Sequence, residues 1–421
     1  MLKQTLRRSH RASARRPDDG GGIRSRLMVI SEFIDSHSAA TAAGTRTRAL
    51  REFFTERGWD VLLVGPRDGG SAVETSRDDG RVRRLTTYET RRQQLQSPAA
   101  VIAFPLSIRE YVNSFREFRP DIVVISGYSP FILVEPLLVA KLLRIPVVFD
   151  VLDSWILLGE FHPGRIRNWL RRSIERFALS RGNLVVGVTK TQLRLLADRY
   201  RLNWQTLVLV PRGADVSTPS GVGARPDYDI IHVGPPRDYY DNEGMLQFLA
   251  RLSSLRPSLR VLFLGIEEGP AKAKLESDLA AHGLTGTAEL HPPVPWSEVA
   301  RWTCRAKSGL VALTRNPLYR AAVSTKAYDY LVAGIPILFL GSSDSEQAEF
   351  VRSYGIGRVC ETPEELAQEA AALLSDEKAL GLFRKNAEVA ASSLAWTQVL
   401  KPFYERAATL LSLRDGEHAR I

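Results

Sequence analysis

The regular alternation of apolar and amphipathic segments is the feature that most constrains the fold of this chain. Residues 26–33 and 59–65 are short apolar runs, and residues 45–57 between them have the spacing of an amphipathic helix. Strands that alternate with helices in this way form parallel sheets that are covered by helices on both faces. The alternation resumes at residue 108 and continues to residue 375, so the sequence predicts an α/β fold with doubly wound sheets.

Two stretches interrupt this alternation. Residues 66–97 are polar and show little periodicity, which predicts a long surface excursion. Residues 217–226 are rich in Pro, Gly, Ser and Ala, which is typical of a linker between domains. We therefore expect a disordered basic tail at 1–25, Rossmann-like domains at 26–216 and 217–392, and a C-terminal helix at 393–421.

The composition is that of a soluble globular protein. Hydrophobic residues make up 44% and charged residues 25% of the 421 residues, enough for two or three domains. The longest apolar region, residues 131–149, contains Glu135, Lys141 and Arg144, which a bilayer would bury at high cost. Two cysteines cannot build a disulfide framework, so we expect a cytoplasmic location.

The net charge of +10 is concentrated at the N-terminus. Residues 1–26 hold eight basic and two acidic residues, a net +6, which leaves +4 for the other 395 residues. A nucleic-acid-binding protein carries more charge on its folded part, so we expect no nucleic acid partner. The tail is a solvated extension without a role, a targeting presequence, or an electrostatic tether to an anionic membrane surface.

Residues 323–339 are predicted to form a short helix followed by a buried strand. Ser324 or Thr325 can cap the first turn through its hydroxyl. Gly334 suits a left-handed C-terminal cap, and Pro336 prevents the helix from continuing. Apolar residues recur at helical spacing between these ends, at Val323, Ala327, Tyr330 and Leu331.

The polar residues of this helix indicate a nucleotide site. The N–H groups of its first turn, the hydroxyls of Ser324 and Thr325 and the ammonium of Lys326 together suit a phosphate or pyrophosphate. Asp329 lies one turn further on, where a carboxylate can accept from both hydroxyls of a ribose. The alternative is an ordinary crossover helix with a solvated lysine and aspartate.

Two glycine-containing turns between a strand and a helix are further phosphate candidates. Gly44 lies at the start of the first domain's first helix, and Gly234 ends the strand at 228–234. A glycine allows the backbone to approach a ligand, although it is also common in such turns for steric reasons alone. Arg237 follows Gly234 and can pair with a diphosphate through its fork of donors.

The strand at 146–151 carries carboxylates at its C-terminal end, Asp150 and Asp153. Ligands of open parallel sheets bind beyond the carboxyl ends of the strands, which makes these residues site candidates. Alternatively, Asp153 caps the following turn.

Residues 163–182 form a basic amphipathic segment with six arginines and a single acid, Glu175. Its apolar residues recur at helical spacing: Ile166, Trp169, Leu170, Ile174 and Phe177. In the commoner arrangement this stripe would be a core face and the arginines would be solvated. In the other, the helix lies on an anionic bilayer.

A resemblance to a known family rests on residues 324–337, which read Ser-Thr-Lys-Ala-Tyr-Asp-Tyr-Leu-Val-Ala-Gly-Ile-Pro-Ile. A Lys, an acidic residue, an aromatic residue and Gly-x-Pro follow in this order in the donor-binding signature of the GT-B glycosyltransferases, specifically the large retaining family four. The resemblance implies that Asp329, in place of the usual Glu, holds the donor ribose. It also implies that the helix N-terminus faces the diphosphate.

The resemblance covers nearly the whole chain from residue 26 and implies two Rossmann-like domains that face a central cleft. The C-terminal helix would cross back onto the first domain. The segment Asp153-Ser-Trp155 is similar to an Asp-x-Trp segment on the acceptor side of several family members. This chain departs from the family at Arg212, Glu243 and Ala321, where relatives commonly have Asn, Lys and Glu.

Motifs of several other enzyme classes do not occur in the sequence. The absence of G-x-G-x-x-G, of G-x-x-x-x-G-K-[ST] and of H-E-x-x-H argues against a dehydrogenase, a P-loop NTPase and a zinc protease. The seven histidines show no metal-ligand spacing, so we expect no metal site. No other cofactor is expected, because the nucleotide sugar is a substrate.

We therefore expect a retaining glycosyltransferase that moves a sugar from a UDP- or GDP-linked donor to an acceptor hydroxyl. The acceptor would be a sugar, a lipid-linked molecule or a small molecule. Catalytic roles fall to Arg237 and Lys326, which stabilise the departing diphosphate, and to Asp153, which orients the acceptor. The donor-binding residues would be Gly44, Gly234, Arg237, Ser324, Thr325, Lys326 and Asp329.

The expected location is the cytoplasm, at the inner membrane face if the basic tail and helix 163–182 bind an anionic surface. A nucleotide-sugar 2-epimerase is a second hypothesis on the same fold. A third is a catalytically inactive GT-B protein that binds a partner or a membrane.

Overall fold

The computed structural model describes residues 24–32, 34, 42–66, 81–85, 104–127, 130–158, 164–216, 226–237 and 240–418. Nearly all of the basic tail, most of the predicted linker and most of the predicted excursion lie outside these residues. The described chain folds into two compact units. Unit 1 contains the described residues of Met1–Val188, Leu193–Val210 and Leu400–Ile421, and unit 2 contains Thr189–Gln192 and the described residues of Pro211–Val399.

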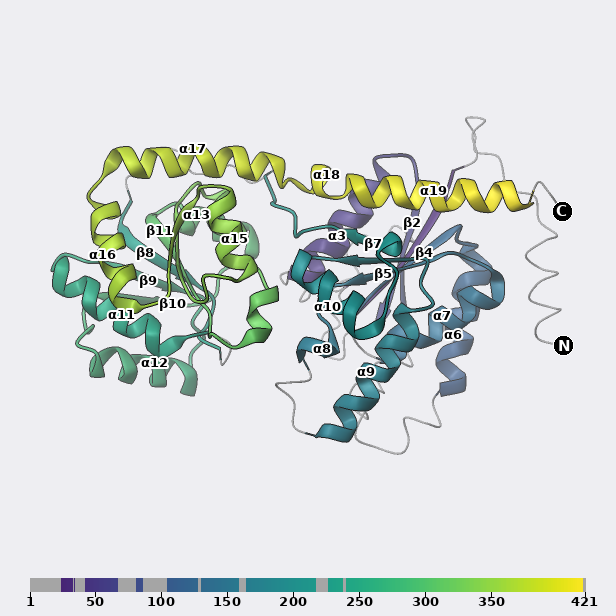
Figure 1. Ribbon diagram of the computed structural model, residues 1–421, viewed down its shortest axis with the longest axis horizontal. Coiled ribbons are helices and arrows are strands. Elements are labelled where there is room, and N and C mark those ends of the chain that lie inside the picture. The colour runs from purple at the N-terminus through teal and green to yellow at the C-terminus, as the bar shows by residue number, and fades with distance from the viewer. Residues whose placement is uncertain are drawn as a thin grey trace. The chain divides into compact units, whose positions relative to one another are not determined.

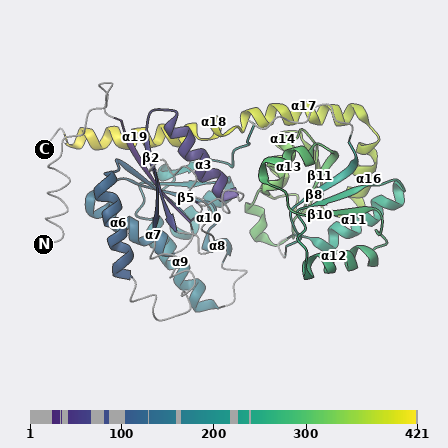
Figure 2. The same ribbon diagram turned by 180° about the vertical axis from the view of Figure 1, so that it is seen from behind.

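Unit 1 is built on a parallel sheet with the strand order β3-β2-β1-β4-β5-β6-β7, and helices cover both of its faces (Figures 1 and 2). Strands β4 and β5 are buried along their whole length, as expected of largely apolar strands in a parallel sheet, and their polar residues Ser126 and Asp150 are buried as well. The strands are β1 (Arg26–Ser31), β2 (Asp60–Pro66), β3 (Val82–Leu85), β4 (Ile122–Ser126), β5 (Val147–Val151), β6 (Leu184–Gly187) and β7 (Leu207–Leu209). The helices are α3 (Ala42–Thr55), α6 (Phe104–Phe118), α7 (Pro130–Leu143), α8 (Trp155–Leu158), α9 (Arg165–Leu179), most of α10 (Lys190–Tyr200) and α19 (Lys401–His418).

Unit 2 is built on a second parallel sheet, with the strand order β10-β9-β8-β11-β12-β13. Its strands are β8 (Tyr228–Val233), β9 (Val261–Leu264), β10 (Ala288–His291), β11 (Ala306–Ala312), β12 (Ile337–Leu340) and β13 (Gly357–Cys360). Its helices are α11 (Asn242–Leu255), α12 (Pro270–Ala281), α13 (Trp296–Thr303), α14 (Thr325–Val332), α15 (Glu346–Ser353), α16 (Pro363–Leu374), α17 (Glu377–Ser393) and α18 (Trp396–Val399). The prediction of doubly wound parallel sheets is confirmed for both units.

Two edge strands, β3 and β13, do not appear among the predicted elements. The prediction of an irregular excursion at 66–97 is wrong for residues 82–85, which pair in parallel with β2. Both strands are four residues long, and each contains arginine. An edge strand needs fewer apolar residues than a central one, so the alternation of apolar runs does not reveal it.

The chain returns to unit 1 through α19, which contributes aromatic residues to that unit. The ring centroid of Phe403 lies 5.6 Å from that of Phe54, and the centroid of Tyr404 lies 6.2 Å from that of Trp59. Pro402 lies in the first turn of α19, where its missing N–H costs no helical hydrogen bond. In the part of the chain that the structure describes, no helix is both long and apolar enough to cross a bilayer.

Candidate active site

Helix α14 begins where the sequence predicts the nucleotide site. Ser324 occupies the N-cap position, but its side chain makes no capping hydrogen bond. The expectation that the Ser324 hydroxyl caps the helix is therefore wrong. The N–H of Ser324 donates to Oε1 of Gln347 at 2.8 Å, so Gln347 fixes the backbone at the start of α14 instead. Thr325 is exposed as the first residue of the helix.

Tyr330 fixes α14 against the sheet of unit 2. Its ring lies on Gly309 of β11, where an added Cβ would come within 2.3 Å of the ring. Its hydroxyl accepts from the N–H of Val233 at 3.2 Å and donates toward the carbonyl oxygen of Leu310 at 3.1 Å. Burial raises the pKa of Tyr330, so the phenol keeps the proton that it donates. These contacts hold the helix beside the turn after β8, which contains Gly234.

Lys326 is buried within unit 2, with only 5% of its surface exposed. Its Nζ lies 3.4 Å from Nε2 of His232 and 4.1 Å from the ring centroid of Tyr240. A protonated amine can donate to the imidazole and is attracted by the face of the phenol ring. Gly234 lies on another side of the amine, since an added Cβ there would be 3.3 Å from Nζ.

Burial lowers the pKa of Lys326 to about 7; the charge of Asp329 opposes this shift and that of Arg237 adds to it. Burial also lowers the pKa of His232 well below its ordinary value, and the charge of Lys326 contributes. His232 is therefore neutral at pH 7 and can accept from Lys326. An anionic ligand beside Nζ would stabilise the protonated amine, so the position favours a phosphate group.

Asp329 lies one turn after Lys326 and is half-buried. Burial raises the pKa of its carboxyl group, while the charges of Arg212 and Lys326 lower it. Its carboxyl oxygens have no hydrogen-bond or ion-pair partner among the described residues. The guanidinium of Arg212 lies 5.5 Å from the ring centroid of Tyr328, and its Nε and Nη1 have no hydrogen-bond partner within the described chain. Both the acceptors of Asp329 and the donors of Arg212 are thus available to a ligand.

The turn after β8 combines a conformation that favours glycine with an exposed cation. Gly234 has φ = 85°, in the left-handed region, and its N–H donates to the carbonyl oxygen of Leu264 at 2.6 Å. Arg237 is exposed, and its carbonyl oxygen accepts from the N–H of Tyr240 at 2.9 Å. The turn that carries Arg237 is therefore tied to Tyr240, whose ring contacts Lys326.

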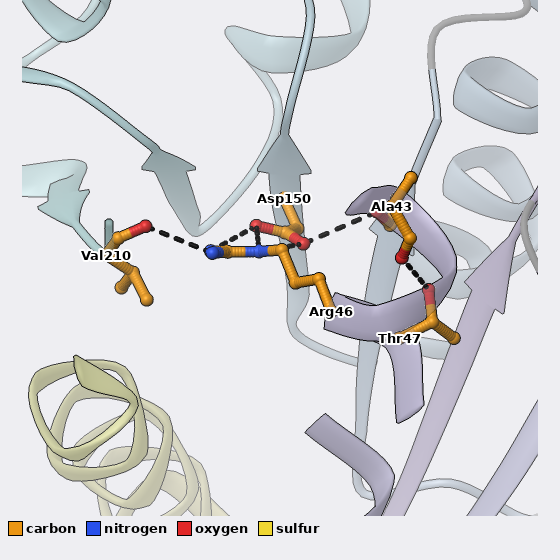
Figure 3. Close-up of polar contacts among 6 residues, drawn as sticks. Ala43, Arg46, Thr47, Asp150 and Val210 are labelled. Carbon is orange, nitrogen blue, oxygen red and sulfur yellow. Dashed lines mark hydrogen bonds and ion pairs between the residues drawn. The ribbon is translucent and has the colours of Figure 1, made fainter. Parts of the chain in front are cut away.

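In unit 1, Asp150 is committed to an internal ion pair (Figure 3). Arg46 of α3 donates to its carboxylate through Nε at 2.9 and 3.0 Å and through Nη2 at 2.8 Å. Nη1 of Arg46 donates to the carbonyl oxygen of Val210 at 3.1 Å, so one side chain joins α3, β5 and the end of β7. Both charged side chains are only 2% exposed. This pairing removes Asp150 from the site candidates.

Gly44 lies two residues before Arg46. The helix begins at Ala42, so Gly44 is buried inside the first turn of α3 rather than at the end of the preceding loop. The first-turn N–H groups of a helix have no intrahelical acceptor, so the predicted backbone approach to a ligand at Gly44 stays a prediction.

Asp153 lies in an exposed turn after β5. Its carboxyl group makes no hydrogen bond to the following turn within the described residues, so the turn-cap alternative has no support. The protein around the carboxyl group raises its pKa by desolvation. The residue itself is exposed in the turn after β5, so its carboxyl group can be reached by an acceptor.

Glu175 of α9 holds the turn that carries Asp153. Its carboxyl group accepts from Oγ of Ser154 at 2.9 Å, from the N–H of Trp155 at 3.1 and 3.2 Å, and from the hydroxyl of Tyr200. Burial raises the pKa of Glu175 to about 7, and the hydrogen bonds limit the rise. The sequence offered one signal for this role: Glu175 is the single acid in an arginine-rich segment.

Replacing Glu175 with alanine is expected to destabilise unit 1 by about 3–5 kcal/mol, because three donors lose their common acceptor. The Glu175→Gln variant retains an acceptor oxygen and is expected to lose less. The folded pKa of about 7 lies above the ordinary value of 4.5, so ionisation is disfavoured in the folded state. Wild-type stability should therefore fall by roughly 3 kcal/mol as pH rises from about 4.5 to 7, and the glutamine variant should lack this fall.

Urea unfolding of unit 1 at a series of pH values measures both effects. The Glu56→Gln variant, with an exposed carboxylate on the same unit, is the matched control and should follow the wild-type pH profile. Parallel profiles for wild type and Glu175→Gln would contradict the assigned pKa shift.

The structure distributes the predicted site residues over the two units. Those that lie in unit 2, around α14 and the turn after β8, are Gly234, Arg237, Ser324, Thr325, Lys326 and Asp329. Gly44 and Asp153 lie in unit 1. Sequence analysis missed the contacts of His232 and Tyr240 with Lys326. A histidine between apolar residues near the carboxyl end of β8 is a signal that could have indicated His232.

Comparison with known proteins gives a family-model match over part of the chain and a fold. Residues 41–213 match the model of the glycosyl transferase 4-like domain. Sucrose-phosphate synthase from Thermosynechococcus elongatus is similar in structure, with a TM-score of 0.69, 14% identity, and coverage of 93% of this chain and 100% of that chain. A glycosyltransferase from Rickettsia africae has a TM-score of 0.67, 13% identity, and coverage of 91% and 97%. Anabaena HepE, solved in complex with UDP and glucose, has a TM-score of 0.65, 12% identity, and coverage of 92% and 100%.

At these identities the structural likeness establishes the fold alone. No curated protein matches the chain. The α/β architecture is the one shared by these proteins, and the predicted fold class is confirmed.

Proposed function

Since the chain has the GT-B fold and resembles the group 1 glycosyltransferases, with residues 41–213 matching the glycosyl transferase 4-like domain, we propose that it is a glycosyltransferase. It transfers a sugar from a nucleoside diphosphate sugar, UDP- or GDP-linked, to an acceptor hydroxyl. The stereochemistry at the transferred sugar is retained. HepE, solved with UDP and glucose, is a structural relative that supports a donor of this class.

The observation that carries this proposal is the arrangement of α14. Lys326 presents a buried amine beside Gly234, and Asp329 presents unpaired carboxyl oxygens one turn away. A diphosphate at the amine and the N-terminus of the helix would leave the ribose of the same nucleotide near Asp329. The positive charge of Arg212 acts on Asp329 and would help to orient its carboxylate.

Transfer from this site depends on stabilising the negative charge of the departing diphosphate, and it does not need a nucleophile from the enzyme. Lys326 and Arg237 stabilise the negative charge that develops on the departing diphosphate. Arg237 is exposed and can close onto a bound phosphate through its side chain. Ser324 and Thr325 contribute hydroxyls at the start of α14, and Asp153 orients the acceptor hydroxyl. Metal-independent transfer agrees with this set of donors.

The donor site can be tested by calorimetric titration of UDP, GDP and their common sugars. We expect one nucleotide to bind wild type, and the Asp329→Ala variant to lose roughly 1–3 kcal/mol, because both ribose hydroxyls lose their acceptor. The Asp278→Ala variant is the matched control on α12 and should bind as wild type does.

The same titrations separate the alternatives. Failure of every nucleotide to bind wild type would refute the transferase. Binding without transfer or donor hydrolysis would favour a catalytically inactive GT-B protein. A change of sugar configuration without an acceptor would favour a nucleotide-sugar 2-epimerase.

A further inference from the structure

Helix α9 exposes the apolar stripe that most amphipathic helices bury. Ile166 is 84% exposed, Trp169 64%, Leu170 51% and Phe177 38%. The interpretation of this stripe as a core face is therefore wrong for these four residues, while Ile174, the fifth, is half-buried. In Figures 1 and 2, α9 lies at the periphery of unit 1.

The opposite side of α9 attaches the helix to its unit. The buried residues of the helix are Asn168, Glu175, Ala178 and Leu179. At about 100° per residue, these positions lie on the side of the helix opposite the exposed apolar stripe. The stripe is thus an outer face of a firmly packed helix, and burial of α9 within unit 1 does not require it.

Arginines border the stripe on both sides. With the same helical spacing, Arg165, Arg172 and Arg176 follow one border, and Arg167 and Arg171 follow the other. Arginines at i and i+4 repel each other, which weakens a helix. Burial lowers the pKa of Arg171, and the charge of Arg167 one turn earlier lowers it further. The charge pattern therefore opposes helix stability and is suited to an external anionic partner.

An apolar strip between two cationic borders is the layout of a helix that lies in a membrane interface. Apolar side chains enter the acyl boundary, Trp sits at the headgroup level, and long arginine side chains reach the phosphates. The single acid of the helix, Glu175, faces the protein interior, so the outer face carries no carboxylate of its own. A uniformly cationic border fits anionic headgroups.

We propose that the outer face of α9 docks unit 1 on an anionic lipid bilayer. The docking proposal rests on the proposed function and adds to it a location for the acceptor, at the membrane surface. Two contacts connect α9 to the turn that carries Asp153: the Glu175 hydrogen bonds and the guanidinium of Arg171, 4.1 Å from the ring centroid of Trp155. Because Glu175 faces away from the docked face, the acceptor-orienting turn would lie one helix diameter, roughly 10 Å, from the lipid surface, which suits a lipid-linked acceptor.

The test is co-sedimentation of the full chain with vesicles of phosphatidylcholine, with or without about 30% phosphatidylglycerol, at about 100 mM salt. We expect wild type to bind the anionic vesicles only. The Trp169→Glu/Leu170→Glu variant should bind at least about 30-fold more weakly, since two inserted side chains become charged. Each Arg→Ser change at 165, 172 or 176 should weaken binding about 5-fold.

The matched control is Leu382→Glu/Val389→Glu on α17, where the two side chains are 59% and 66% exposed. This variant carries the same added charge and should bind vesicles as wild type does. Undiminished binding of Trp169→Glu/Leu170→Glu would overturn the proposal and assign binding to the basic N-terminal residues. Equal binding to neutral vesicles would also overturn it. If wild type does not bind vesicles but self-associates, and Trp169→Glu/Leu170→Glu abolishes this self-association, the outer face of α9 would be assigned to contact with a second copy of the chain.

Nucleotide titration of the same proteins separates this proposal from the proposed function. If the chain binds a nucleotide but does not bind vesicles, the docking proposal is overturned and the proposed transferase function is unaffected. Vesicle binding that depends on Trp169 and Leu170, by a chain that binds no nucleotide, supports docking and refutes the transferase.

Discussion

Replacing Lys326 with methionine is expected to lower the turnover of sugar transfer by about 100- to 1,000-fold, the usual cost of losing one preorganised donor to a developing charge. Methionine fills much of the volume of the lysine stem between His232 and Tyr240, so unit 2 should remain folded. Steady-state kinetics with the donor identified by calorimetry would measure the loss. The Lys378→Met variant, with an exposed lysine on α17, is the matched control and should retain wild-type turnover.

The pH dependence of donor binding gives an independent readout of the same variant. Because the pKa of Lys326 is about 7 in the free protein, its amine is mostly neutral above that pH. A bound diphosphate raises this pKa, so binding takes up a proton and affinity falls by up to tenfold per pH unit above pH 7. Titrations at pH 8 in buffers of different ionisation enthalpy would detect the proton. The Lys326→Met variant should show neither uptake nor the fall in affinity, and an unchanged profile would exclude Lys326 from the phosphate site.

Replacing Arg46 with methionine is expected to destabilise unit 1 by about 3–5 kcal/mol. The carboxylate of Asp150 would remain buried without a charged partner, with the hydroxyl of Ser126, 3.3 Å away, as its remaining donor, and the carbonyl oxygen of Val210 would lose its donor. The Arg46→Met/Asp150→Leu double variant should recover a large part of the loss, because an apolar pair avoids the unpaired charge. Urea unfolding at pH 7 would measure the loss, with amide hydrogen exchange of β5 as the signal that reports on unit 1 separately from unit 2.

The Arg116→Met variant on α6 is the control for this experiment. Its arginine is exposed, so the change should stay within about 0.5 kcal/mol. An equal loss of stability in the single and double variants would show that the volume of Arg46, rather than its charge, supports the packing of α3 on the sheet.

The spacing of residues along the sequence predicted the helix that carries most of the candidate site in unit 2. The spacing of Ala327, Tyr330 and Leu331 defines α14, and Gly334 ends it with φ = 69°. Lys326 and Asp329 are three residues apart on this helix, so they lie on the same side of it. This relation follows from the local sequence alone. Helix α9 was predicted for the same reason, since helical periodicity is a property of neighbouring residues.

The sequence by itself therefore determined the α/β alternation, the position of α14 and the amphipathic character of α9. Only the tertiary structure decided that Lys326 lies against His232 and that Arg46 pairs with Asp150, because partners 94 and 104 residues apart leave no local periodicity. It also decided which side of α9 is buried. Periodicity shows that a helix has two faces, but the packing of other elements determines which face remains in solvent.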